Sequence, residues 1–303
     1  MTVAAPLRVA ITGASGMIGS MLAPALVAAG HQVVPIVRGE PRTGEIRWDP
    51  AGAGLDPAAL RGVDAVVHLA GANIAGRWTE ARKRAVLESR TLGTRLLAEA
   101  LARAPNGPAT LVSASAIGYY GNRGDEELTE ASPAGSGFLP QVTEAWEAAT
   151  ATAADAGIRV AKVRTGLVLS SAGGLLRKML LPFRLGLGGR LGDGRQWMSW
   201  IAAADLIGVF RHLLEGTLSG PVNAVAPGAV RNREFTAALG RALHRPTVFP
   251  LPKTVIRMLF GQMGNEAILG SAQVLPAVLE RSGFRFQYPV LDGALAHELE
   301  VTR

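Results

Sequence analysis

Short apolar runs alternate with longer helical patterns through the first half of the chain. Each run is bounded by glycine or polar residues, which is typical of strands buried on both faces of a sheet. The patterns predict helices over 16–29, 80–103 and 141–156. They predict strands over 7–11, 32–37, 63–69, 110–114 and 158–163. This alternation favours βαβ units with right-handed crossovers, and therefore an α/β fold with a doubly wound parallel sheet.

The pattern changes after about Gly166. Residues 170–230 are rich in glycine and loop-like, apart from a helix expected over 205–214. Further helices are expected over 233–243, 252–260 and 271–282, and the segments 284–288 and 291–299 close the chain. We therefore expect a nucleotide-binding domain over 1–230, in which 170–230 supply substrate-region loops. Residues 231–303 would form a smaller α+β cap.

The composition excludes several kinds of site. The chain has 303 residues, 48% of them apolar, and no cysteine, so disulfides, thiolate catalysis and cysteine-bound metals are excluded. Its five histidines are scattered without the spacing of metal ligands, and we expect no metal site. No uncharged apolar run reaches the roughly 18 residues of a membrane span, and the first seven residues do not look like a secretory signal. A cytoplasmic protein is expected.

The chain is basic, with 31 Lys and Arg residues against 24 Asp and Glu residues. Such an excess can indicate nucleic acid or anionic lipid, but here the basic residues look spread along the chain and favour a role in solubility. One local cluster is interleaved with glycines instead of stacking aromatics, which favours an anionic small molecule over a nucleic acid or a membrane. Its members are Arg177, Lys178, Arg184, Arg190 and Arg195. The oligomeric state is left open.

A glycine-rich turn, Gly13-Ala14-Ser15-Gly16-Met17-Ile18-Gly19, joins the first expected strand to the first expected helix. In this context Gly13 permits the tight turn, Gly16 lets the backbone approach a pyrophosphate, and Gly19 lets helix and strand pack closely. The helix N-terminus offers unpaired N–H groups to a phosphate. The turn therefore predicts a dinucleotide cofactor and a Rossmann-like sheet.

The residue that ends the second expected strand selects the cofactor. An acidic residue there would bind the ribose 2′-hydroxyl of NAD, whereas Arg38 suits the 2′-phosphate of NADP. Glu40, two residues further on, keeps NAD open as the alternative. Leu69-Ala70-Gly71 follows another central strand, where small residues let a ligand lie across the sheet edge.

Longer strings give a specific resemblance that covers essentially the whole chain. The strings are Gly13–Gly19, His68–Gly71, Trp78, Ser89-Arg90, Ser113–Ala116, Gly118–Gly121, Arg164–Leu169, Gly186–Gly189, Gln196 and Ser199–Ile201. They resemble the extended short-chain dehydrogenase/reductase superfamily, and within it the atypical NADP(H)-binding epimerase-like family with a C-terminal domain of unknown function. The resemblance implies a Rossmann core that binds NADP(H). The implied cofactor contacts are Gly13, Ser15, Gly16, Met17, Ile18, Gly19, Arg38, Leu69, Ala70, Arg90 and Val168.

The sequence departs from the superfamily at its acid/base pair, a tyrosine with a lysine four residues later on one helix face. None of the three tyrosines has a lysine at that spacing, and Phe138 and Val142 stand at the expected place. The remaining candidates for catalysis are Ser113, Ser115, Tyr119 and Tyr120, which could also serve in packing or in strand-end hydrogen bonds. Candidate substrate contacts are Arg184, Gln196 and Trp200.

Two functions follow from these features. The first is an NADP(H)-dependent oxidoreductase or epimerase-like enzyme that acts on a small, possibly anionic molecule with altered acid/base groups. The second is a non-catalytic NADP(H) sensor or regulatory module, which the missing tyrosine–lysine pair suggests.

Overall fold

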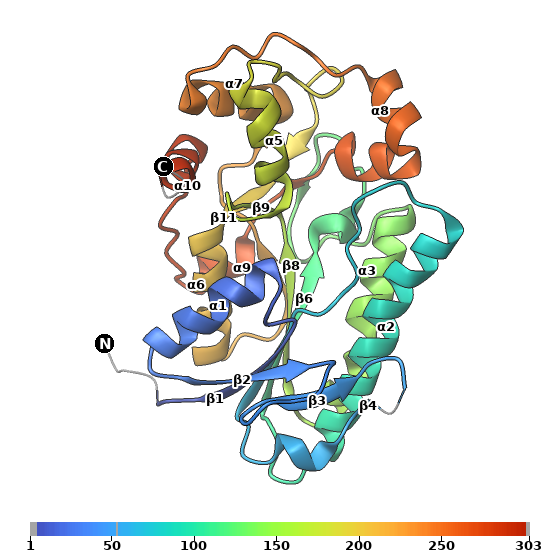
Figure 1. Ribbon diagram of the computed structural model, residues 1–303, viewed down its shortest axis with the longest axis vertical. Helices are drawn as coiled ribbons and strands as arrows, with labels where there is room; N and C mark the ends of the chain where they lie inside the picture. The colour runs from blue at the N-terminus through green and yellow to red at the C-terminus, as the bar shows by residue number, and fades with distance from the viewer. Residues whose placement is uncertain (1–4, 53, 301–303) are drawn as a thin grey trace.

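The computed structural model describes residues 5–52 and 54–300, and its centre is a sheet in the strand order β12-β8-β6-β5-β1-β2-β3-β4 (Figure 1). Every neighbouring pair is parallel except β3 and β4. The chain leaves β1 toward β2 on one side and returns to β5 on the other, so β1 and β5 flank the point where the strand order reverses. The strands are β1 (Arg8–Thr12), β2 (Gln32–Val37), β3 (Ile46–Asp49), β4 (Gly54–Leu55), β5 (Ala65–His68), β6 (Thr110–Ala116), β8 (Arg159–Thr165) and β12 (Gly220–Ala224).

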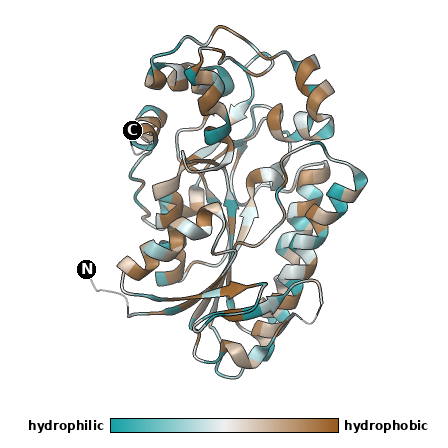
Figure 2. Cartoon of the chain, in the orientation of Figure 1, coloured by the Kyte–Doolittle hydropathy of each residue, from teal (hydrophilic) through white to brown (hydrophobic). Residues whose placement is uncertain are grey.

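Helices cover both faces of this sheet. On one face lie α1 (Met17–Ala28) and α6 (Ala203–Glu215), and on the other lie α2 (Glu80–Arg103), α3 (Phe138–Ala148) and α4 (Ala151–Asp155) (Figure 1). Figure 2 shows their apolar sides turned toward the strands. Two separate apolar clusters result, because a parallel sheet buried on both faces needs a core on each. The predicted α/β doubly wound fold is confirmed.

The C-terminal residues form a lobe above the carboxyl ends of the strands. It contains α5 (Gly174–Arg184), α7 (Asn232–Leu243), α8 (Lys253–Phe260) and α10 (Leu291–Glu300), while α9 (Ala277–Arg281) lies against β12. Its core is built around Trp200, Phe235 and Leu239, all fully buried. Three short strand pairs connect distant segments: β9 (Leu167–Leu169) with β11 (Trp200–Ala202), β10 (Trp197–Met198) with β13 (Val230–Arg231), and β7 (Glu127–Leu128) with β14 (Gln273–Val274). Short turns lie at η1 (Pro57–Leu60), η2 (Ile117–Tyr120) and η3 (Gly264–Ile268).

The helix expected over 271–282 is wrong. Ser271 lies in an extended segment that leads into β14, and helix α9 starts only at Ala277. The residue before a proline avoids helical backbone, so Leu275-Pro276 separates the two elements. The Ser199 hydroxyl holds the extended part, accepting from Val274 N and donating to Ala272 O, both at 2.9 Å.

Two other expectations need correction. The single helix over 141–156 is two helices, α3 and α4, that meet at Thr150. The loop-like 170–230 segment contains α5, whose buried side chains Leu176, Leu180 and Phe183 have helical spacing. The segment looked loop-like because glycines flank α5 on both sides and raise the glycine content of the whole segment.

No helix in the described part of the chain is long and apolar enough to cross a membrane. Among the same residues, no group of three or more histidine and acidic side chains is placed to hold a metal ion.

Candidate functional site

The glycine turn lies between β1 and the first turn of α1, packed against the end of β5. Gly13 has a φ of +68°, and a Cβ on it would lie 3.1 Å from Ala70 N. A Cβ on Gly19 would lie 2.7 Å from the Ala14 Cα, closer than real side chains approach backbone. The start of α1 has no side-chain cap and no acidic residue in its first turn, so its N–H groups are free for a phosphate.

A buried polar group supports this turn from below. Thr12 Oγ1 accepts hydrogen bonds from Leu69 N at 3.1 Å and Ala70 N at 3.3 Å. Its own proton is therefore directed at His68 Nδ1, 2.7 Å away, and the Nε2–H of His68 faces Thr94 Oγ1 at 3.0 Å. His68 is fully buried, and burial lowers its pKa to about 4. The neutral imidazole thus fixes the ends of β1 and β5.

This histidine should make stability depend on pH. Between pH 6.5 and about 4 the unfolded chain binds a proton at His68 that the folded protein rejects. The free energy of unfolding should fall as the pH falls through this window, by up to about 3 kcal/mol, and His68 should contribute nothing to the pH dependence above it. Denaturant unfolding of wild type and His68→Gln across this range measures the difference. Equal slopes for the two proteins would contradict the prediction.

Arg38 extends beyond the end of β2 and is exposed, with no ion-pair partner among the described residues. The nearby Glu40 is engaged, since its carboxylate binds Arg47 Nη1 at 3.1 Å on the neighbouring strand β3. The acidic residue that kept NAD open is thus paired within the protein, whereas the arginine is available to an external anion.

Arg90 projects from α2 toward the end of β5. Its Nη1 donates to Ala72 O at 3.0 Å, and its guanidinium lies 5.0 Å from the ring centre of Trp146. Burial lowers the pKa of Arg90 to about 10, and no carboxylate of the described residues pairs with it. It also lies directly under Gly71, where a Cβ would be 3.4 Å from its Cζ. A half-buried cation without a counterion suits the phosphates of a ligand.

The remaining predicted cofactor contacts gather beside the turn. Met17, Ile18 and Leu69 pack against the same apolar cluster as Val168, which lies on β9. Ser15 is exposed in the turn itself, and Ala70 follows β5. The fold therefore brings the glycine turn, the end of β5 and Val168 together. Arg38 lies just after β2, and Arg90 lies on α2 beside the end of β5.

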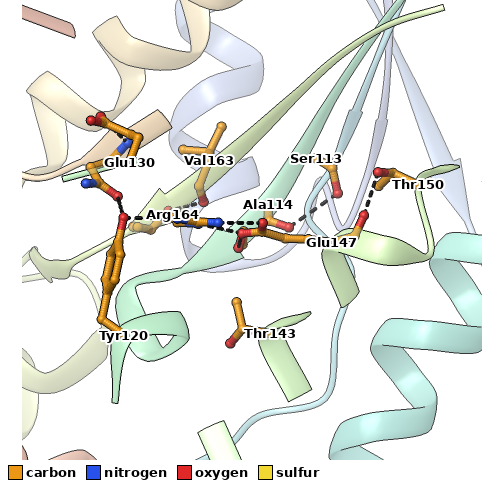
Figure 3. A network of polar contacts seen from close by, with 12 residues as sticks. Ser113, Ala114, Tyr120, Glu130, Thr143, Glu147, Thr150, Val163 and Arg164 are labelled. Carbon is orange, nitrogen blue, oxygen red and sulfur yellow. Dashed lines mark hydrogen bonds and ion pairs between the residues drawn. The ribbon is translucent and has the colours of Figure 1, made fainter. Parts of the chain in front are cut away.

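Two candidate catalytic hydroxyls belong to a buried polar network (Figure 3). Ser115 Oγ donates to Glu147 Oε1 at 2.6 Å, and the same carboxylate forms a two-point ion pair with Arg164 at 2.7 and 2.8 Å. Arg164 Nη1 donates to the Tyr120 hydroxyl at 3.0 Å, which in turn donates to Asn223 Oδ1 at 2.7 Å. The network connects β6, α3, β8 and β12.

The environment of this network changes the proton affinity of its members. Burial raises the pKa of the Tyr120 hydroxyl, and the charge and hydrogen bond of Arg164 only partly oppose this. For Arg164, burial lowers the pKa, but the bonds and charge of Glu147 raise it overall. Tyr120 is fully buried and already partnered, so this arrangement suits a structural hydroxyl.

Tyr119 differs from Tyr120. Its ring lies 3.5 Å from the Arg164 guanidinium and edge-on to Tyr120, but it is only partly buried, and its hydroxyl has no hydrogen-bond partner among the described residues. Ser113 is buried, and its hydroxyl reaches only the neighbouring Ala114 carbonyl, at 3.3 Å. Of the four candidate hydroxyls, that of Tyr119 is the one that is neither fully buried nor hydrogen-bonded to another described residue.

Sequence reasoning missed Glu147 and Asn223 as partners. A weak signal existed in Arg164, one of three basic residues of β8 and the one that the strand buries. Such a residue requires a buried counterion, although the sequence does not say which carboxylate supplies it.

Phe138 and Val142 lie one turn apart on α3, as the spacing predicts. The Phe138 ring packs edge-on against Trp78, with centroids 4.9 Å apart, and Val142 is buried. Neither side chain can carry a proton.

The three candidate substrate contacts lie in different environments. Trp200 is fully buried and donates its indole N–H to Gly228 O at 2.8 Å. Gln196 is also buried, and its amide reaches Leu191 O at 3.1 Å. Arg184 is exposed at the end of α5.

Comparison with known proteins identifies the family of the chain. Residues 9–225 match the model of the NAD dependent epimerase/dehydratase family, and 251–298 match a domain of unknown function, DUF1731. The chain belongs to the NAD dependent epimerase/dehydratase family. This confirms the resemblance drawn from the sequence. The boundary predicted between 230 and 231 falls between the two matches and stays a prediction.

Similar proteins extend over nearly the whole chain. Epimerase family protein Mb2239 of Mycobacterium bovis is 47% identical over 292 residues, covering 95% of this chain and 96% of the relative. The crystal structure of human epimerase family protein SDR39U1 (isoform 2) with NADPH has a TM-score of 0.90 and 38% identity, covering 97% of this chain and 99% of the human one. A nucleoside-diphosphate sugar epimerase from Corynebacterium glutamicum has a TM-score of 0.81 and 40% identity, and the match covers 97% of this chain and 58% of that protein's chain.

Proposed function

We propose that this protein is an NADP(H)-dependent oxidoreductase or epimerase-like enzyme that acts on a small molecule. The observation that carries the proposal is the glycine turn, which has no space for a Cβ at Gly19 and leads into an uncapped N-terminus of α1, with Arg38 just after β2 and Arg90 beside the end of β5. Both arginines lack a carboxylate partner among the described residues, as expected for groups that bind phosphates. The human relative crystallised with NADPH supports the same cofactor.

The chain's own residues suggest how the reaction is assisted. When bound, NADP(H) exchanges a hydride with a carbonyl or alcohol carbon. Tyr119 holds the proton exchanged with the substrate oxygen, because its hydroxyl is partly exposed and has no hydrogen-bond partner among the described residues. Arg164 and Glu147 hold the Tyr119 ring in place. The substrate is small and anionic, and the relative named a nucleoside-diphosphate sugar epimerase makes sugar nucleotides the first compounds to test.

The test is NADPH oxidation, followed by absorbance, against a panel of carbonyl compounds that includes nucleotide-linked keto sugars. Tyr119→Phe should lower turnover by about a hundredfold or more while leaving NADPH affinity and stability unchanged. Tyr120→Phe should lower the free energy of unfolding by about 1–3 kcal/mol, because Arg164 and Asn223 lose a buried partner. Tight NADPH binding without turnover of any compound would count against an enzyme.

Arg38→Ala should weaken NADPH binding by at least about tenfold, because a charge-assisted contact to the 2′-phosphate is lost. NADH, which lacks that phosphate, should bind almost as before. Fluorescence titration with both nucleotides measures the two affinities, and Arg95→Ala on the exposed face of α2 is a matched control. Equal losses for NADPH and NADH would show that Arg38 does not recognise the 2′-phosphate.

The second candidate is a non-catalytic NADP(H) sensor. Two observations favour it. The Ser115 and Tyr120 hydroxyls already donate hydrogen bonds within the buried network, and Phe138 and Val142 on α3 are apolar. This reading predicts an NADPH-dependent change in oligomeric state or in partner binding, together with no turnover. Mass measurement in solution with and without NADPH distinguishes it from the enzyme.

A further inference from the structure

The net positive charge of this chain arises in two segments. Residues 174–192 and 235–265 together contain eight of the 31 Lys and Arg residues and none of the 24 Asp and Glu residues. The rest of the chain holds 23 basic and 24 acidic residues, so these segments account for the whole net charge of +7. The basic residues are spread along the sequence, but outside these two segments acidic residues balance them.

The fold brings the two segments side by side at the tip of the C-terminal lobe. Arg245 Nε donates to Arg184 O at 2.8 Å, and Leu251 N donates to Arg190 O at 2.9 Å. Figure 1 shows the end of α5, the chain after α7 and helix α8 together at this end of the molecule.

The same tip is unusually apolar. Among the described residues, eight of the ten large apolar side chains that are exposed lie in these two segments. Five of them form what we term the apical patch: Leu181 (67% exposed), Leu185 (65%), Leu187 (58%), Val248 (68%) and Phe249 (56%). Helix α8 exposes Met258 and Leu259 at the same end of the molecule, across from α5 and α7, and Figure 2 colours this helix largely as hydrophobic. Exposed apolar groups gathered in this way mark a binding surface.

Most of the cations around the apical patch have no counterion. Lys253 pairs with Asp193 and Arg241 with Asp292, each at 2.7 Å. The other six have no carboxylate within ion-pair distance among the described residues. These six are Arg177, Lys178, Arg184, Arg190, Arg245 and Arg257. Lys178 and Leu181 on α5 and Leu185 directly after it follow at helical spacing, which alternates charge and apolar surface on one exposed face.

We propose that the apical patch binds the surface of an anionic phospholipid bilayer. Aliphatic side chains surrounded by unpaired Lys and Arg residues suit the boundary between acyl chains and acidic headgroups. A second copy of the chain fits less well, because facing two such surfaces would bring many cations together without a carboxylate between them. Surface binding needs no membrane-spanning helix, so it agrees with the absence of one among the described residues.

Cosedimentation of the full chain with vesicles tests the proposal. The protein should bind vesicles of phosphatidylcholine mixed with phosphatidylglycerol, should not bind vesicles of phosphatidylcholine alone, and should be released by salt. The pair Leu185→Ser with Phe249→Ser should weaken binding by at least about tenfold. The pair Lys178→Gln with Arg190→Gln should weaken it by roughly twentyfold.

Matched variants elsewhere serve as controls. Val27→Ser with Val290→Ser removes equally exposed apolar groups outside the apical patch, and Arg95→Gln with Arg103→Gln removes two exposed charges of α2. Both controls should bind vesicles like wild type, and all variants should keep the wild-type NADPH affinity.

Three results would overturn the proposal. The first is a wild-type protein that does not bind the anionic vesicles, or apical variants that bind them as well as the controls do. The second is a dimer, seen by light scattering, that the apical variants dissociate while vesicles do not bind. The third is binding to polyglutamate but not to vesicles, which would assign the surface to an acidic protein.

Discussion

Glu147→Met is expected to lower the free energy of unfolding by about 3–5 kcal/mol, because it leaves Arg164 buried without its counterion. The Arg164 and Glu147 side chains are only 4% and 9% exposed, so water cannot replace the lost carboxylate. The Ser115 hydroxyl loses its acceptor as well. Denaturant unfolding followed by circular dichroism measures the change.

Two comparisons identify the cause of this loss. Adding Arg164→Met to Glu147→Met should cost no more stability than the single change, because the uncompensated charge is removed. Glu80→Met breaks an exposed pair with Lys83 and should cost no more than about 1 kcal/mol. A double variant much less stable than Glu147→Met would mean that packing, and not the buried charge, dominates.

Gly19→Ala is expected to weaken NADPH binding by about a hundredfold or more. The added Cβ would lie 2.7 Å from the Ala14 Cα and still closer to the Gly13 carbonyl, so turn and helix must move apart. A displacement of about 1 Å in a binding loop can cost a factor of this size. Titration of protein fluorescence with NADPH gives the affinity.

The matched control is Gly293→Ala. Gly293 lies within helix α10, and a Cβ there would meet nothing within 4 Å. Alanine is the better helix former, so the control should keep full affinity and gain up to about 1 kcal/mol of stability. If Gly19→Ala bound NADPH as tightly as the control does, the turn would not be the dinucleotide site.

The network around Arg164 marks the limit of reasoning from local patterns. A charged residue that a strand buries needs a partner, and Arg164 is the basic residue of β8 that is buried. Its partner Glu147 is 17 residues away on α3, and Asn223 is further still along the chain. No spacing rule connects them, because they meet only when β6, β8 and β12 pair beside α3.

The sequence by itself determined the alternating strands and helices, the glycine turn and the family of this protein. These features rest on backbone geometry and local periodicity, which act between residues close in the chain. The tertiary structure decided which hydroxyls are open, since Tyr119 and Tyr120 are neighbours in sequence but differ in burial and partners. It also gathered two distant basic segments into one apolar and charged tip, because contacts between remote residues depend on the packing of the whole chain.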